Sequence, residues 1–122
     1  MGVPDVVIVG GGMITHDQIL PSLYQLQLEG SAGEIHIVAL QGRALRELAA
    51  SETIGRAFPE SSFRAWPSLD ADPDEKHPTL YEEVIGSLKP GSVAVVAVPD
   101  QLHFQTVMAA LAHDLHVICV KP

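Results

Sequence analysis

Short apolar runs alternate with helical stretches along the whole chain. The runs cover residues 6–9, 35–40, 62–66, 92–98 and 115–120. Helical spacing or composition covers residues 13–28, 43–50, 80–88 and 101–113. Apolar runs without polar alternation indicate strands buried on both faces, and such strands are parallel and joined by helices. The sequence therefore predicts an α/β fold, a doubly wound, Rossmann-like sheet of about five parallel strands with helices on both faces.

Local signals mark several boundaries within this pattern. Pro21 interrupts the first helical stretch, so that this helix is either kinked or restarted there. Residues 70–78 form a charged loop, and Thr79 and Asp100 are suited to cap the helices that follow them. No composition shift divides the chain, and we expect one domain over residues 1–122.

Charge and cysteine content narrow the classes of partner. The 122 residues include 7 Lys and Arg against 15 Asp and Glu, a formal net charge of −8. Nucleic-acid binding needs clustered basic residues, and a membrane span needs about 18 consecutive apolar residues, so we expect neither nucleic acid nor membrane as a partner. The single cysteine, Cys119, lies between Ile118 and Val120, which predicts a buried thiol and a reducing, cytoplasmic setting.

A glycine-rich turn follows the first strand, and ligands of such sheets bind beyond the carboxyl ends of the strands. Gly10 would make the tight turn, and Gly12 would let the backbone approach a pyrophosphate at the next helix N-terminus. Thr15 takes the place of the third glycine of a dinucleotide-binding fingerprint. We expect Gly10 and Gly12, with Met13 and Ile14, to bind a cofactor. The alternative is an ordinary strand-to-helix turn.

The second strand ends without the Asp or Glu that binds the ribose 2′-hydroxyl of NAD. Gln41, Gly42 and Arg43 occupy that place. Arg43 could pair with a 2′-phosphate, and Arg46 follows one helical turn later. We therefore favour NADP over NAD as the cofactor. The alternative is that both arginines simply face solvent.

Further candidates follow the fourth and fifth strands. Pro99 ends the fourth strand, and Asp100 is explained by helix capping as well as by cofactor contact. His103, three residues into the next helix, would reach either the ligand or water, and Lys121 would project into the same crevice. The six histidines show no ligand-like spacing with carboxylates or with the cysteine, so we expect no metal site.

Three segments together resemble a known family. They are Val9-Gly10-Gly11-Gly12-Met13-Ile14, Val98-Pro99-Asp100-Gln101-Leu102-His103 and His116-Val117-Ile118-Cys119-Val120-Lys121-Pro122. In order and spacing they resemble the Gfo/Idh/MocA oxidoreductases, the relatives of glucose–fructose oxidoreductase and inositol dehydrogenase. The resemblance implies an NAD(P)-binding Rossmann domain, followed in the family by an α+β domain that binds a sugar or cyclitol.

The resemblance also implies roles for individual residues. Gly10 and Gly12 would cradle the pyrophosphate, and Pro99, Asp100 and His103 would lie beside the nicotinamide ribose. Lys121 would be the catalytic lysine that positions or polarises the substrate. Two features depart from the family. Val120 stands where the motif has glutamate, and Gln41-Gly42-Arg43 replaces the acidic end of the second strand, as in NADP-using members.

In the family, the Asp/His pair for proton transfer comes from the second domain, and we expect residues 1–122 to hold the cofactor domain without it. We therefore expect the cofactor domain of an NAD(P)-dependent oxidoreductase that transfers a hydride to or from a sugar- or cyclitol-like alcohol or carbonyl, inactive alone. The alternative is a non-catalytic dinucleotide-binding sensor or scaffold. The apolar fifth strand would be an open sheet edge, so we also expect self-association into a homo-oligomer.

Overall fold

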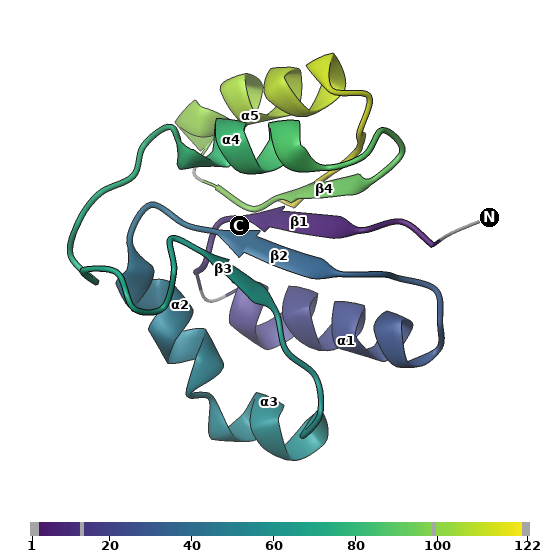
Figure 1. The fold of residues 1–122 in the computed structure, drawn as a ribbon, viewed down its shortest axis with the longest axis vertical. Helices are drawn as coiled ribbons and strands as arrows, with labels where there is room; N and C mark the ends of the chain where they lie inside the picture. The colour runs from purple at the N-terminus through teal and green to yellow at the C-terminus, as the bar shows by residue number, and fades with distance from the viewer. Residues whose placement is uncertain (1–2, 13, 99, 121–122) are drawn as a thin grey trace.

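The chain folds into one parallel sheet covered by helices, in a computed structural model that describes residues 3–12, 14–98 and 100–120 (Figure 1). The strands are β1 (Val6–Val9), β2 (Ile35–Val38), β3 (Arg64–Trp66), β4 (Val93–Val96) and β5 (His116–Cys119). The helices are η1 (Thr15–Ile19), α1 (Leu20–Leu28), α2 (Gly42–Ala49), α3 (Glu52–Ala57), α4 (Leu80–Ser87) and α5 (Asp100–Ala112). All strand pairs are parallel, in the order β3-β2-β1-β4-β5. The predicted Rossmann-like fold is confirmed.

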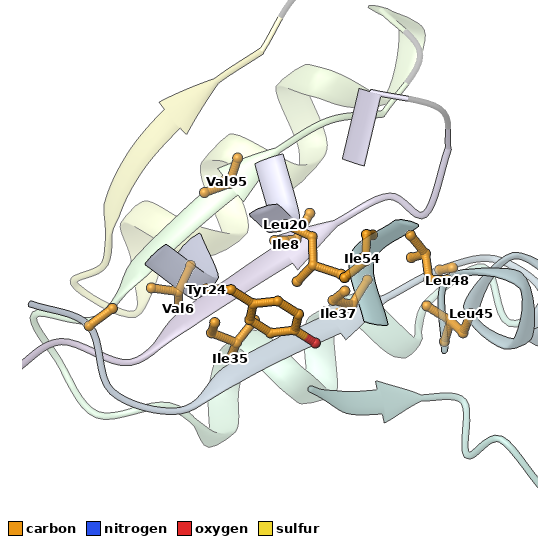
Figure 2. Close-up of a cluster of buried hydrophobic side chains, with 12 residues drawn as sticks. Val6, Ile8, Leu20, Tyr24, Ile35, Ile37, Leu45, Leu48, Ile54 and Val95 are labelled. Atoms are coloured by element: carbon orange, nitrogen blue, oxygen red, sulfur yellow. The ribbon is translucent and has the colours of Figure 1, made fainter. Parts of the chain in front are cut away.

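The side chains of the central strand β1 alternate between two separate hydrophobic cores, one on each face of the sheet. All four residues are therefore apolar. Val6 and Ile8 belong to a cluster with α1, α2 and α3, whereas Val7 and Val9 belong to a cluster with α4 and α5. The first cluster holds Val6, Ile8, Leu20, Tyr24, Ala32, Ile35, Ile37, Ala39, Leu45, Leu48, Ile54 and Val95 (Figure 2). The second holds Val7, Val9, Val38, Val84, Ile85, Ala94, Ala110 and Leu115. Helices therefore cover both faces (Figure 1).

Tyr24 fills the centre of the first cluster and is 3% exposed. Phe58, at the end of α3, packs against it with 5.6 Å between the ring centroids. Burial raises the pKa of Tyr24 to about 12, because the charged phenolate would be poorly solvated in this core.

Register aligns the ends of the three inner strands. Val9 at the end of β1 is level with Val38 of β2 and with Val96 of β4. The loops that leave these strands therefore start from the same edge of the sheet. That edge is where ligands bind in folds of this kind.

Pro21 accounts for the unusual start of the first helix. Proline has no N–H to donate within an α-helix, and its ring collides with the carbonyl four residues earlier. The chain forms a wider π turn over Thr15–Ile19, in which the Leu20 N–H bonds to the Thr15 carbonyl. Pro21 then lies in the first turn of α1, where no donor is required. The helical backbone runs without a break from η1 into α1, so the helix does not restart at Pro21; the π turn before the proline is the local irregularity.

Three expectations of local structure need correction. The Thr79 side chain makes no capping hydrogen bond to α4. The short helix α3 was not expected; it is capped by Ser51, whose side chain accepts a hydrogen bond from the Ile54 N–H. Cys119 is exposed rather than buried, because β5 is the last strand of the sheet and its outer side is uncovered. Within the part of the chain that the structure describes, no helix is long and apolar enough to cross a bilayer.

Candidate dinucleotide-binding cleft

A cleft of about 470 Å³ opens at the carboxyl ends of β1, β2 and β4. Its lining residues are Gly10, Gly11, Gly12, Ala39, Leu40, Gln41, Arg43, Ala44, Glu47, Ala97, Val98 and Leu102. The chain leaves β1 toward the face with α1 and leaves β4 toward the face with α5 (Figure 1). The cleft thus lies where the connections diverge to opposite faces, the position of ligand sites in doubly wound sheets.

Gly10 is held in place by both neighbouring strands. Its N–H donates to the Val38 carbonyl at 2.8 Å, and its φ is +120°, a backbone conformation that side chains rarely adopt. A Cβ atom at this position would lie 2.2 Å from the Ala97 carbonyl oxygen. The Thr15 hydroxyl, fully buried, donates to the Gly10 carbonyl at 2.8 Å and closes the turn from the helix side. Gly10 is therefore required by the fold itself.

The two glycines that follow serve different purposes. A Cβ atom on Gly11 would lie 3.1 Å from the Ala44 Cβ and 3.3 Å from the Ala39 Cβ, so its small size lets α2 approach the turn. A Cβ atom on Gly12 would meet no atom of the described residues within 4 Å, its chain neighbours aside, and Gly12 is exposed and lines the cleft. Packing against the described residues therefore does not explain the glycine at position 12. The space above it is free for a ligand.

The arginines after β2 are engaged by a distant loop. Arg43 Nε donates to Asp74 Oδ1 at 3.1 Å, and Arg43 Nη2 also contacts that oxygen. This hydrogen bond with Asp74 raises the pKa of Arg43 above its ordinary value. Arg46 donates to the carbonyls of Leu69 and Ala71 at 2.9 and 2.8 Å. Both arginines are exposed, as the alternative held, but each also bonds to the loop, and Arg43 lines the cleft with its guanidinium already paired.

The remaining predicted site residues lie at different depths around the cleft. Gly42 is buried at the start of α2, where a Cβ atom would lie 3.6 Å from Pro67 Cγ. Gln41 lines the cleft and donates from Nε2 to the Asp74 carbonyl at 3.0 Å. Ile14 is half-buried beside the glycine turn and does not line the cleft.

Candidates on the far side of the cleft are only partly described. His103 is half-buried in the first turn of α5, and its Nε2 has no hydrogen-bond partner among the described residues. α5 begins at Asp100, one residue earlier than predicted. The positions Met13, Pro99 and Lys121 lie outside the described residues.

An apolar slot of about 130 Å³ adjoins the cleft on the side of α4 and α5. The slot and the cleft share Gly10, Ala39, Leu40, Val98 and Leu102. The other slot residues are Val9, Val38, His77, Pro78, Tyr81 and Thr106. Sequence reasoning missed the slot, and it treated the segment before α4 only as a charged loop. The signal available was topological, since that segment follows β3 and so leaves from the ligand-binding edge of the sheet.

A second hollow of about 450 Å³ lies beside the glycine turn, between η1 and α2. His16 bridges it, with Nδ1 2.7 Å from Asp17 Oδ1 and Nε2 2.8 Å from the Ser51 hydroxyl. Ser51 also caps α3, so this contact ties the first helix to α3. Across the described parts of the chain, no three His, Cys, Asp or Glu side chains gather as a metal site.

Comparison with solved structures supports the fold. A Bacillus subtilis protein assigned as an oxidoreductase, yvaA, aligns with a TM-score of 0.52 at 17% identity, over 97% of this chain and 26% of its own. An oxidoreductase from Sinorhizobium meliloti aligns with a TM-score of 0.49 at 21% identity, over 100% of this chain and 30% of its own. This chain therefore spans less than a third of either solved relative. No curated protein matches it.

The family comparison covers almost the entire chain. The model described as "Oxidoreductase family, NAD-binding Rossmann fold" matches residues 5–122. That match includes all five strands, the glycine turn and the cleft. The chain belongs to the Gfo/Idh/MocA oxidoreductase family, of which it carries the NAD-binding Rossmann domain.

Proposed function

We propose that this chain binds a nicotinamide dinucleotide as part of an oxidoreductase that acts on a sugar- or cyclitol-like alcohol or carbonyl. The bound nicotinamide would accept or donate a hydride. The chain's own residues would hold and orient the dinucleotide, and the substrate pocket and proton-transferring groups would come from a second domain. The family assignment and the cleft at the end of β1 support this proposal.

The observation that carries the proposal is the contrast between Gly10 and Gly12. Gly10 is a glycine because the fold leaves no room for a Cβ atom, whereas Gly12 has open space on the cleft side. A pyrophosphate against Gly12 would use that space and meet N–H groups of the first helical turn, which lack intrahelical partners. The adenine ring would suit the apolar slot between Leu40, Tyr81 and Leu102.

Binding is tested directly by titrating NADH and NADPH separately into the purified chain, by calorimetry at equal salt. We expect saturable binding with one dinucleotide per chain. Adenosine, which lacks the pyrophosphate, should bind far more weakly and serves as the control ligand. If neither dinucleotide binds up to about 1 mM, corresponding to a standard binding free energy no better than about −4 kcal/mol, the proposal is wrong.

NADP is the dinucleotide that we favour from the sequence, with Arg43 as the ligand of the 2′-phosphate. Support would be a preference for NADPH of about tenfold or more, about 1.4 kcal/mol, that Arg43→Ala removes. Because Arg43 is already paired with Asp74, an incoming phosphate has to displace a carboxylate. The catalytic role of Lys121 and the contacts of Pro99, Asp100 and His103 with the nicotinamide ribose rest on the family motifs.

We also propose that the chain self-associates through the side formed by α5 and β5. Phe104, Met108 and Leu111 recur at helical spacing on α5 and are 75%, 50% and 53% exposed, and Ile118 on β5 is 54% exposed. Light scattering at high micromolar concentration should give a dimer or larger species. Phe104→Glu should reduce that mass, whereas Leu28→Glu, at an exposed position on α1, should not. A monomeric wild-type chain would count against this proposal.

The cytoplasm is the compartment that we propose. Cys119 is the single cysteine of the sequence and is exposed on β5, so the chain has no internal disulfide to form. A reducing compartment keeps such a thiol from linking two chains.

A further inference from the structure

The loop of residues 67–77 packs against the connection between β2 and α2 and is hydrogen-bonded to it. Pro67 and Pro73 lie against Gly42, at 3.6 and 3.7 Å from a Cβ atom placed there. Backbone and side-chain hydrogen bonds join the two segments at five further points. They run from Arg43 N to Pro73 O, Gln41 Nε2 to Asp74 O, His77 N to Leu40 O, Arg46 Nε to Leu69 O and Arg46 Nη2 to Ala71 O.

Hydrogen bonds hold Asp74 next to the cleft residues Gln41 and Arg43 through its N–H, its carbonyl and its carboxylate. Its N–H donates to Asp72 Oδ1 at 2.9 Å, and its carbonyl accepts from Gln41 Nε2 at 3.0 Å. Its carboxylate accepts from Arg43 Nε at 3.1 Å and is contacted by Arg43 Nη2. The end of β2 has no acidic residue of its own. Asp74, from the segment that follows β3, places a carboxylate next to the end of β2 instead.

We propose that Asp74 sets the choice between NAD and NADP by competing with the 2′-phosphate for Arg43 and by placing a carboxylate where that phosphate would bind. The inference rests on the proposed function. In sheets of this kind the adenosine ribose lies at the end of β2, and a carboxylate there accepts a hydrogen bond from a 2′-hydroxyl but repels a 2′-phosphate. Asp74 places a carboxylate at this corner from outside the usual position, and so lowers the preference for NADPH that Arg43 gives without excluding NADPH.

Neighbouring charges strengthen the effect of Asp74. Asp74 raises the pKa of Arg43 most, and the charges of Glu47 and Asp72 raise it further, so the local field also opposes an added phosphate. Arg46 is engaged by the carbonyls of Leu69 and Ala71 and is not directed to the cleft by any contact of the described residues. Among the described residues that line the cleft, Arg43 is the one cation, and Asp74 is already bonded to it.

The decisive variant is Asp74→Asn, which removes the charge and keeps the shape of the side chain. We expect the affinity for NADPH relative to NADH to rise about tenfold, because the phosphate no longer displaces or faces a carboxylate. The five hydrogen bonds that hold the loop do not use the Asp74 carboxylate, so the loop should remain in place. The gain should shrink at 0.5 M salt, about ten times the ionic strength of a dilute buffer, since both side chains are exposed.

Further variants test whether the change in the NADPH to NADH ratio comes from the charge of Asp74 itself and not from the net charge of the loop. Asp70→Asn removes an acid from the same loop and should leave the NADPH to NADH ratio unchanged. Asp74→Glu keeps the charge and should keep the wild-type ratio. In the Arg43→Ala background Asp74→Asn should give a smaller gain, since the phosphate then has no guanidinium to reach and only the repulsion by the carboxylate is removed.

The outcomes distinguish this inference from the proposed function. If NADH binds and Asp74→Asn leaves the ratio unchanged, or if Asp70→Asn changes it equally, Asp74 does not select the cofactor and only the inference is wrong. If neither dinucleotide binds to wild type or to any variant, the proposed function is wrong and the inference is overturned with it.

Discussion

Replacing Gly12 with valine should abolish the binding of NADH and NADPH while leaving the thermal stability of the chain nearly unchanged. Gly12 is exposed, and no atom of the described residues beyond its chain neighbours lies within 4 Å of a Cβ placed there, so we expect the free protein to accept a larger side chain at little cost. It would instead fill the side of the cleft that a pyrophosphate must approach closely. We expect a loss of at least about 100-fold in affinity, or about 2.7 kcal/mol.

Calorimetric titration measures the affinity, and thermal unfolding followed by circular dichroism measures the stability of the same variant. Gly55→Val is the matched control, since Gly55 in α3 also has no atom within 4 Å and does not line the cleft. Affinity that stays within about threefold of wild type in Gly12→Val, less than 0.7 kcal/mol, would show that no phosphate lies against this turn.

The fold could be predicted because burial on both faces leaves a strong trace in the sequence. Val6–Val9 and Val93–Val96 are uninterrupted apolar strands, since alternate residues enter the two cores. The first predicted strand has the predicted bounds, and the other four are present but shorter. In β2 and β4 the apolar residues beyond the last pair, Leu40 and Val98, line the cleft instead of extending the sheet.

The glycine turn could likewise be interpreted from its position after the first strand. Sequence reasoning assigned the tight turn to Gly10 and the close approach to Gly12, and the space around the two glycines differs in that sense. Thr15 was interpreted as the replacement of the third glycine of the fingerprint, a position where a small residue lets the helix pack closely. Its hydrogen bond to the Gly10 carbonyl adds a second reason for a small hydroxyl-bearing residue there.

The corner after β2 could not be predicted, because its character depends on residues far away in the sequence. Arg43 and Asp74 are 31 positions apart, and no local pattern indicates that the charged loop folds back onto α2. The exposure of Cys119 was also missed. The fifth strand was expected at the edge of the sheet, where β5 does lie, but the apolar neighbours Ile118 and Val120 were taken to bury Cys119, and Ile118 and Cys119 are both exposed.

Gly10→Ala should cause the largest loss of stability of any single substitution in the turn. The new Cβ atom would lie 2.2 Å from the Ala97 carbonyl oxygen and 2.9 Å from its carbon, both of them backbone atoms at the end of β4. Gly10 also has φ of +120°, which alanine adopts only with strain. We expect a loss of at least about 3 kcal/mol, which lowers the melting temperature by about 10 °C.

Gly91→Ala separates the clash from the backbone strain. Gly91 has φ of +89°, but no atom lies within 4 Å of a Cβ placed there, so alanine meets strain alone at a cost of about 1 kcal/mol. Urea unfolding of both variants gives the two free energies. Equal losses would mean that the contact with Ala97 relaxes at little cost, and that Gly10 is not clamped between β2 and β4. A much larger loss in Gly10→Ala, beside an unchanged stability in Gly12→Val, would assign the first glycine of the turn to folding and the second to the ligand.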